Sequence, residues 1–100
     1  MSRFDISRID DIIHGRLRLG IMAYLASAET ATFNELLEKL DATKGNLSVQ
    51  LRKLDEAGYV DVDRQIVGRK TETRARLTKT GRKAFGDYLD AMTALVNSGD

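Results

Sequence analysis

The sequence predicts a mainly α-helical domain of the α+β class, and two observations lead to that prediction. Several segments repeat apolar residues at spacings of three and four, as amphipathic helices do, whereas residues 59–63 alternate apolar and acidic side chains, as strands do. The chain has 100 residues, of which 42% are hydrophobic. That length fits one hydrophobic core, so we predict a single domain over residues 1–100.

The amino-terminal part is predicted to be helical and then briefly extended. Apolar spacing favours a helix over residues 9–26, and a glycine predicts a break near residues 14–15 that separates a short lead-in helix from the main first helix. Residues 30–32 are small or β-branched and predict a short strand. A second helix is expected to follow, because Thr32 and Glu35 have the spacing of a capping box.

The rest of the chain predicts a third helix, a β-hairpin and a last helix. The third helix is expected over Lys44–Ala57, after a threonine cap and before a glycine. Residues 59–63 and 73–77 are the predicted strands, and the polar residues 65–72 between them are the predicted hairpin tip. Thr78 is expected to cap the last helix. Two short helices joined by a tight turn and followed by a hairpin describe a winged helix-turn-helix.

Basic residues are concentrated in one part of the chain. Residues 64–83 hold eight basic side chains and one acidic side chain, a net charge of +7, whereas the other eighty residues hold eight basic and fourteen acidic side chains. Such asymmetry on a nearly neutral chain predicts a polyanionic partner. A solvated basic hairpin without a partner is the alternative interpretation.

The predicted third helix has one apolar and one polar face. At 100° per residue, Leu47, Leu51 and Leu54 form the buried face, and the opposite face is polar and basic. Such a face suits the major groove of DNA, where amides can read adenine and basic side chains can reach guanine or phosphate. Val49 also faces outward, either to contact a thymine methyl group or as a lone surface valine. The polar face and the basic wing 64–76 together predict the following DNA-binding residues: Lys44, Asn46, Ser48, Val49, Gln50, Arg52, Lys53, Arg69, Lys70 and Arg74.

Apolar residues at the two chain ends exceed what a winged domain of this size needs for its core. We therefore predict a homodimer in which both ends pair across a two-fold axis. Packing of the two ends within one chain is the alternative. The predicted interface residues are Phe4, Ile6, Ile9, Ile12, Ile13, Tyr88, Met92, Leu95 and Val96.

Catalysis, metal binding and membrane contact are not predicted. The chain has no Cys and a single histidine, His14, whereas a metal site needs about four good ligands. His14 is therefore interpreted as structural, and no cofactor or catalytic constellation is expected. The charged amino terminus differs from a signal peptide, and no apolar run is long enough to span a membrane, so we expect a cytoplasmic protein.

Two stretches of the sequence resemble a known family. The segment G-N-L-S-V-Q-L-R-K-L-D-E-A-G-Y-V, followed by V-G-R-K-T-E-T-R-A-R-L-T-K-T-G-R-K-A-F, is similar to the winged helix-turn-helix regulators of the MarR/ArsR group, and the likeness extends over about residues 9–89. The resemblance implies a small, dimeric, sequence-specific regulator of transcription that binds double-stranded DNA. It implies, by position, that DNA is faced by Ser48, Gln50, Arg52, Lys53, Arg69 and Lys70. A winged helix that docks on protein or RNA is the alternative, and the sequence names neither an operator nor an effector ligand.

Overall fold

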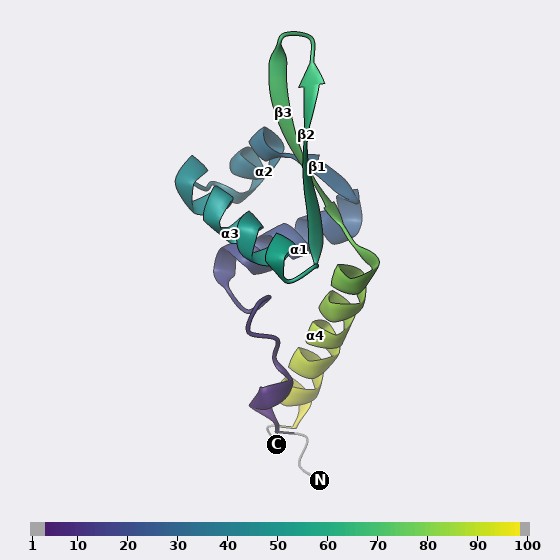
Figure 1. The fold of residues 1–100 in the computed structure, drawn as a ribbon. Helices are drawn as coiled ribbons and strands as arrows, with labels where there is room; N and C mark the ends of the chain where they lie inside the picture. The colour runs from purple at the N-terminus through teal and green to yellow at the C-terminus, as the bar shows by residue number, and fades with distance from the viewer. Residues whose placement is uncertain (1–3, 99–100) are drawn as a thin grey trace.

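The computed structural model describes residues 4–98, which Figure 1 shows as a ribbon. A short 3-10 turn, η1 (Ile6–Arg8), precedes the first helix. The other elements follow in the predicted order and confirm the mainly helical α+β class. They are α1 (Arg16–Ala28), β1 (Thr30–Thr32), α2 (Phe33–Leu40), α3 (Lys44–Glu56), β2 (Val60–Val67), β3 (Lys70–Leu77) and α4 (Lys79–Asn97).

Side-chain caps determine where three of the helices begin. The Thr32 hydroxyl accepts a hydrogen bond from the Glu35 amide at 3.0 Å, and the Glu35 carboxylate accepts one from the Thr32 amide at 3.4 Å. The predicted capping box of α2 is therefore present, and threonines also cap α3 and α4 as predicted. Helix α3 ends at Glu56, one residue before its predicted end, and Gly58 follows with a φ of 80°, a left-handed conformation that favours glycine.

The predicted lead-in helix before α1 is wrong. The Asp10 carboxylate accepts hydrogen bonds from the amides of Ile12 at 2.8 Å and Ile13 at 3.3 Å, and these bonds close a turn instead of a helix. Gly15 is extended and occupies the cap position of α1. The predicted break is therefore confirmed, while a turn and η1 replace the helix that was expected before it.

The three strands form one antiparallel sheet in the order β1-β3-β2. Strands β2 and β3 form the wing, and they pair along their whole length, which leaves only Gly68 and Arg69 as the turn. The expected hairpin tip at residues 65–72 is therefore wrong, because the β-branched side chains of Ile66 and Val67 favour strand. Gly68 has a φ of 65°, as the first position of a type II′ turn requires.

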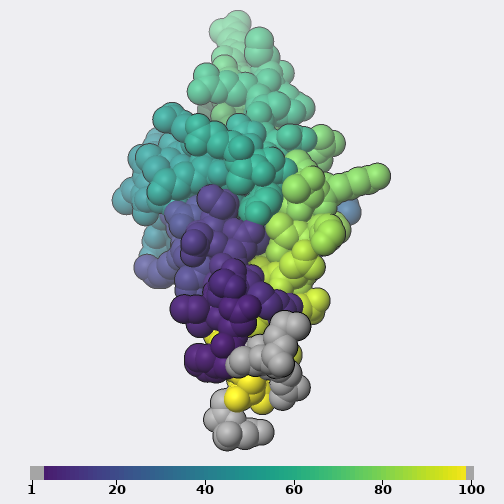
Figure 2. All heavy atoms as spheres, turned by 60° about the horizontal axis from the view of Figure 1, so that its bottom comes forward, coloured from purple at the N-terminus to yellow at the C-terminus, as the bar shows by residue number. Residues whose placement is uncertain are grey.

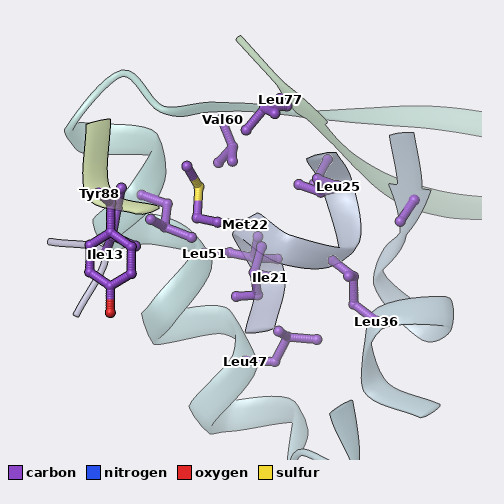
Figure 3. Close-up of a cluster of buried hydrophobic side chains, with 13 residues drawn as sticks. Ile13, Ile21, Met22, Leu25, Leu36, Leu47, Leu51, Val60, Leu77 and Tyr88 are labelled. Atoms are coloured by element: carbon purple, nitrogen blue, oxygen red, sulfur yellow. The ribbon is translucent and has the colours of Figure 1, made fainter. Parts of the chain in front are cut away.

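The core lies where α1, α2, α3 and the base of the wing meet, as Figure 3 shows. The fully buried side chains come from all of these elements and from the turn before α1: Ile13, Ile21, Met22, Leu25, Leu36, Leu47, Leu54 and Val60. Because α3 turns its leucines into this core, its opposite side must face solvent. The core thus sets the orientation of α3.

Helix α4 packs closely on the chain that enters the wing. A Cβ atom added at Gly81 would lie 2.0 Å from the carbonyl oxygen of Tyr59, so only glycine fits there. The Thr78 hydroxyl donates a hydrogen bond to the Gly58 carbonyl at 2.6 Å. These contacts fix the start of α4 against the base of the wing.

The molecule is elongated, with extents of 57 × 25 × 21 Å. The wing extends from the body at one end, and α4 extends with η1 beside it at the other end (Figure 1). Figure 2 shows the amino-terminal segment, in purple, against the yellow end of α4. We call these two segments, residues 4–14 and 88–98, the terminal arm.

Candidate nucleic-acid interface

Helix α3 presents its polar face to solvent, as predicted. Leu47, Leu51 and Leu54 are buried in the core, so the opposite side of the helix is exposed. The exposed residues of α3 up to Lys53 are Lys44, Gly45, Asn46, Ser48, Val49, Arg52 and Lys53. Val49 is 47% exposed, which makes its methyl groups available to a thymine methyl group in a major groove.

The two faces of the wing differ in charge. Because side chains alternate along a strand, the face that packs on α3, called the inner face here, is formed by Val60, Val62, Arg64, Ile66, Thr71, Thr73, Ala75 and Leu77. The outer face is formed by Asp61, Asp63, Gln65, Val67, Lys70, Glu72, Arg74 and Arg76. All three acidic side chains of these strands therefore lie on the outer face. A polyanion meets no acidic side chain of β2 or β3 on the inner face.

Two arginines of the outer face are neutralised by these acids. Arg74 donates a hydrogen bond to Glu72 at 2.7 Å, and Arg76 donates one to Asp61 at 3.1 Å. Arg74 was predicted to contact DNA, but it lies on the side of the wing that faces away from α3. We therefore leave Arg74 out of the interface, since a single step along a strand reverses the face on which a side chain lies.

A groove of about 390 Å³ runs between α3 and the inner face of the wing. Ser48, Arg52 and Asp55 line it from α3, and Arg64 and Thr73 line it from the wing. Within residues 4–98, neither arginine takes part in an ion pair. Two guanidinium groups on opposite walls, together with two hydroxyl groups, suit the oxygen atoms of a phosphodiester strand. Asp55, the one acid in the lining, lies in the last turn of α3.

Arg64 lines this groove and belongs to the predicted basic stretch, although it was not among the predicted DNA-binding residues. The signal that could have found it is the alternation that begins at Val60 and Val62, which places Arg64 on the same face. The predicted strand ended at residue 63, so the alternation was not continued to residue 64. Arg69 and Lys70 are exposed at the far end of the wing, as predicted.

Gln50 makes hydrogen bonds within the protein instead of pointing into solvent. Its side-chain oxygen accepts a hydrogen bond from the Arg18 guanidinium of α1, and its Nε2 donates one to Asn46 Oδ1 at 3.1 Å. The side chain is half-buried, because position 50 lies at the edge of the leucine face and next to α1. We therefore do not assign Gln50 the direct base contact that the sequence predicted.

The predicted dimer residues fall into two groups in the structure. Ile13 and Tyr88 are only 0% and 3% exposed, so they belong to the core of the protomer, and we remove them from the predicted interface. Of the other predicted residues, Ile6 and Val96 are 69% and 73% exposed. All of these other residues lie on the terminal arm.

Tyr59 and Lys83 are two of the groups outside α3 and the wing whose pKa values are shifted by polar contacts. Tyr59 donates a hydrogen bond to the Asp10 carboxylate, and burial together with this bond raises the pKa of Tyr59 to about 12. Near the start of α4, the ion pair of Lys83 with Asp87 at 2.9 Å raises the pKa of Lys83. Tyr59 therefore stays neutral and Lys83 stays charged near neutral pH.

The structure gives no sign of a metal centre within residues 4–98, where no group of three His, Cys, Asp or Glu side chains could hold an ion. The Nδ1 atom of His14 lies 2.8 Å from the Tyr88 hydroxyl, as expected for a structural histidine. No helix of the described chain is long and apolar enough to cross a membrane.

The fold and the exposed basic groove define a winged helix nucleic-acid-binding protein, and comparison with known proteins gives its family. Residues 17–96 match the winged helix DNA-binding domain family. An uncharacterized protein of Methanocaldococcus jannaschii is 37% identical over 78 residues, which cover 78% of this chain and 85% of that protein. A transcriptional regulator homologue from Pyrococcus horikoshii has a similar structure, with a TM-score of 0.82 at 28% identity over 89% of this chain and 88% of that chain. A MarR-like transcriptional regulator from Thermotoga maritima gives a TM-score of 0.59 at 30% identity over 80% of this chain and 56% of that chain.

The chain belongs to the winged helix DNA-binding domain family. This finding confirms the predicted winged helix-turn-helix, and the likeness to the Thermotoga protein agrees with the resemblance to MarR-like regulators. The family and the fold are those of transcription regulators and not of enzymes.

Proposed function

We propose that this DNA-binding regulator recognises a specific sequence in double-stranded DNA. Helix α3 lies in the major groove, with Asn46, Val49 and Lys53 toward the base edges. The inner face of the wing follows the phosphate backbone, and Arg69 and Lys70 reach the backbone or the adjacent minor groove. The proposed place of action is the cytoplasm, because the relatives come from archaea and bacteria, whose DNA lies in the cytoplasm.

The groove between α3 and the wing is the observation that carries this proposal. A DNA strand that borders the major groove must pass beside a helix inserted in that groove, and here the space beside α3 is lined by Arg52 and Arg64. The charge sorting of the wing supports the same orientation, because the acids of β2 and β3 lie on the opposite face. Gly45, with nothing within 4 Å of an added Cβ, leaves room for a close approach at the start of α3.

A titration with labelled nucleic acids tests the proposal. We expect fluorescence anisotropy to show binding to random duplex DNA at low salt. At physiological salt, a selected duplex is expected to bind about a thousandfold or more tightly than random duplex DNA does at the same salt concentration. A winged helix that serves as an RNA-binding or protein-docking module would instead bind duplex RNA equally well, or neither nucleic acid. Either result contradicts the proposal.

A homodimer is the second part of the proposal. Helix α4 continues for six residues beyond Ala91, its last buried residue, and apolar side chains of the amino-terminal segment lie beside this end. Ile6, Leu89 and Val96 are 69%, 47% and 73% exposed, so the terminal arm offers an apolar surface to a second copy of the chain. Light scattering in the absence of DNA is expected to give twice the monomer mass of 11.1 kDa. A monomer at tens of micromolar would contradict the dimer.

A further inference from the structure

A chain of hydrogen bonds connects α1 to the exposed face of α3. Arg18 of α1 donates through Nε to the carbonyl of Ile12 and through Nη1 to Oε1 of Gln50. Gln50 Nε2 then donates to Asn46 Oδ1 at 3.1 Å. The Arg18 guanidinium packs on Gly15, where an added Cβ would lie 2.6 Å from Nη2. The contacts with the Ile12 carbonyl and with Gly15 thus fix the position of the Arg18 guanidinium that donates to Gln50.

The donor and acceptor groups of these side chains determine the direction of each hydrogen bond in the series. An arginine has only donors, so the Gln50 atom that faces it must be the oxygen. The amide nitrogen of Gln50 is then the atom that faces Asn46, and a donor there requires the oxygen of Asn46. The side-chain nitrogen of Asn46 must therefore point away from Gln50. Asn46 is exposed, so this end of its amide is the one available to a partner.

We propose that Arg18 is a specificity-determining positioning residue, which acts through Gln50 to make Asn46 a hydrogen-bond donor toward DNA. This inference rests on the proposed function, because it needs α3 in the major groove. A donor alone matches the acceptors of a base edge, such as N7 and O6 of guanine. Adenine presents one acceptor, N7, and beside it the N6 amino group, which needs an acceptor, whereas the oxygen of Asn46 is turned toward Gln50. The outward amino group of Asn46 therefore matches both groups of the guanine edge and only one group of the adenine edge. Asn46 therefore reads guanine in preference to adenine, in contrast to the adenine contact that the residue type alone suggests.

The base read by Asn46 is first located by selecting duplexes from a random library with the wild-type protein and with Asn46→Ala. The position that loses its preference in the variant is the one in question. We expect guanine there, about tenfold over adenine in competition titrations, as for one good base contact. Adenine at this position in the wild-type selection would overturn the inference.

Two variants then test the role of Arg18 and of the hydrogen bonds that connect it through Gln50 to Asn46. Arg18→Met keeps an apolar stem but removes the donor, so Gln50 and Asn46 can turn over and the guanine preference is expected to fall below about threefold. Gln50→Glu keeps an acceptor for Arg18 but offers Asn46 an acceptor in place of a donor. Asn46 is then expected to turn its oxygen outward and to favour the amino groups of adenine or cytosine. A purely structural role would not produce this reversal.

Arg16→Met is the matched control, because Arg16 is exposed in the same turn of α1 and carries the same charge as Arg18. It is Arg18 that donates to Gln50, and Gln50 that donates to Asn46, so replacing Arg16 removes a charge without removing either hydrogen bond. The affinity of Arg16→Met for random duplex at low salt is expected to match that of Arg18→Met within about twofold, with the guanine preference intact. If the preference survives in both Arg18→Met and Gln50→Glu, the inference is wrong while sequence-specific binding stands. If the wild-type protein selects no sequence, the proposed function fails first and the inference fails with it.

Discussion

Arg64 and Arg76 lie on opposite faces of the wing, and comparing Arg64→Gln with Arg76→Gln tests which face meets DNA. Both substitutions remove one positive charge from β2 or β3 and keep a side chain of similar polarity. Arg64 lines the groove beside α3, whereas Arg76 is paired with Asp61 at 3.1 Å on the outer face. The two variants therefore have the same net charge and differ in the place from which the charge is lost.

The expected effect follows from counterion release. Each phosphate contact contributes about 0.9 to the slope of log affinity against log salt, so at about 0.1 M salt the loss of one contact weakens binding about eightfold. Arg64→Gln should therefore bind random duplex about eightfold more weakly per wing, with a slope that is smaller by about 0.9. Arg76→Gln should stay within about twofold of the wild-type protein, because its charge is already compensated by Asp61.

Anisotropy titrations of a fixed duplex at four or five salt concentrations measure both quantities. Thermal unfolding of each variant is the control for folding, and little change is expected, since both arginines are exposed. If Arg76→Gln reduces the slope and Arg64→Gln does not, DNA lies on the outer face and the orientation of the wing proposed above is refuted.

Three further predictions concern the wing tip, the packing of α4 and pH. Arg69→Ala combined with Lys70→Ala should weaken binding to all duplexes about equally and reduce the salt slope by roughly one unit per lost contact; an unchanged slope would show that both side chains are merely solvated. Gly81→Ala would bring a Cβ to 2.0 Å from a carbonyl oxygen, so we expect a loss of about 2 kcal/mol in urea unfolding, whereas Gly86→Ala, with open space around it, should gain up to about 1 kcal/mol; equal stabilities would contradict the packing described. The folded state raises the pKa of Tyr59 to about 12, whereas an unfolded chain has a tyrosine pKa of about 10. The neutral Tyr59 hydroxyl therefore contributes fully to stability below a pH of about 10, and this contribution is lost as pH rises toward the folded pKa of about 12. The difference in stability between the wild-type protein and Tyr59→Phe should therefore be constant from pH 7 to about 9 and shrink above about 10; a difference that already shrinks below pH 9 would contradict the shift.

The sequence predicted the helices and their caps well, because these signals are local. The leucine spacing of α3 and the capping box at Thr32 depend on residues only three or four positions apart. The lead-in helix failed for a local reason of another kind, since the Asp10 carboxylate competes for the amide groups that a helix would use. The length of the wing was underestimated, because pairing with β3 overrides the polar composition of β2.

The candidate site was predicted less completely, because contacts between elements distant in sequence decide it. The contact of Gln50 with Arg18 joins residues 32 positions apart, and no pattern within α3 reveals it. Arg74 was included and Arg64 was left out because the predicted strands were too short to show which face each side chain occupies. Burial of Ile13 and Tyr88 likewise depends on how the two chain ends meet the core.

Selection of duplexes from a random library tests the central claim most directly. A dimer with one α3 in each of two successive major grooves predicts enrichment of a near-palindrome, with half-sites roughly 10 base pairs apart. The enriched duplex should then bind about a thousandfold or more tightly than random DNA at one fixed salt concentration. Tight binding at low salt with no enriched sequence would contradict the claim, because it would show that α3 and the wing contact only the phosphate backbone.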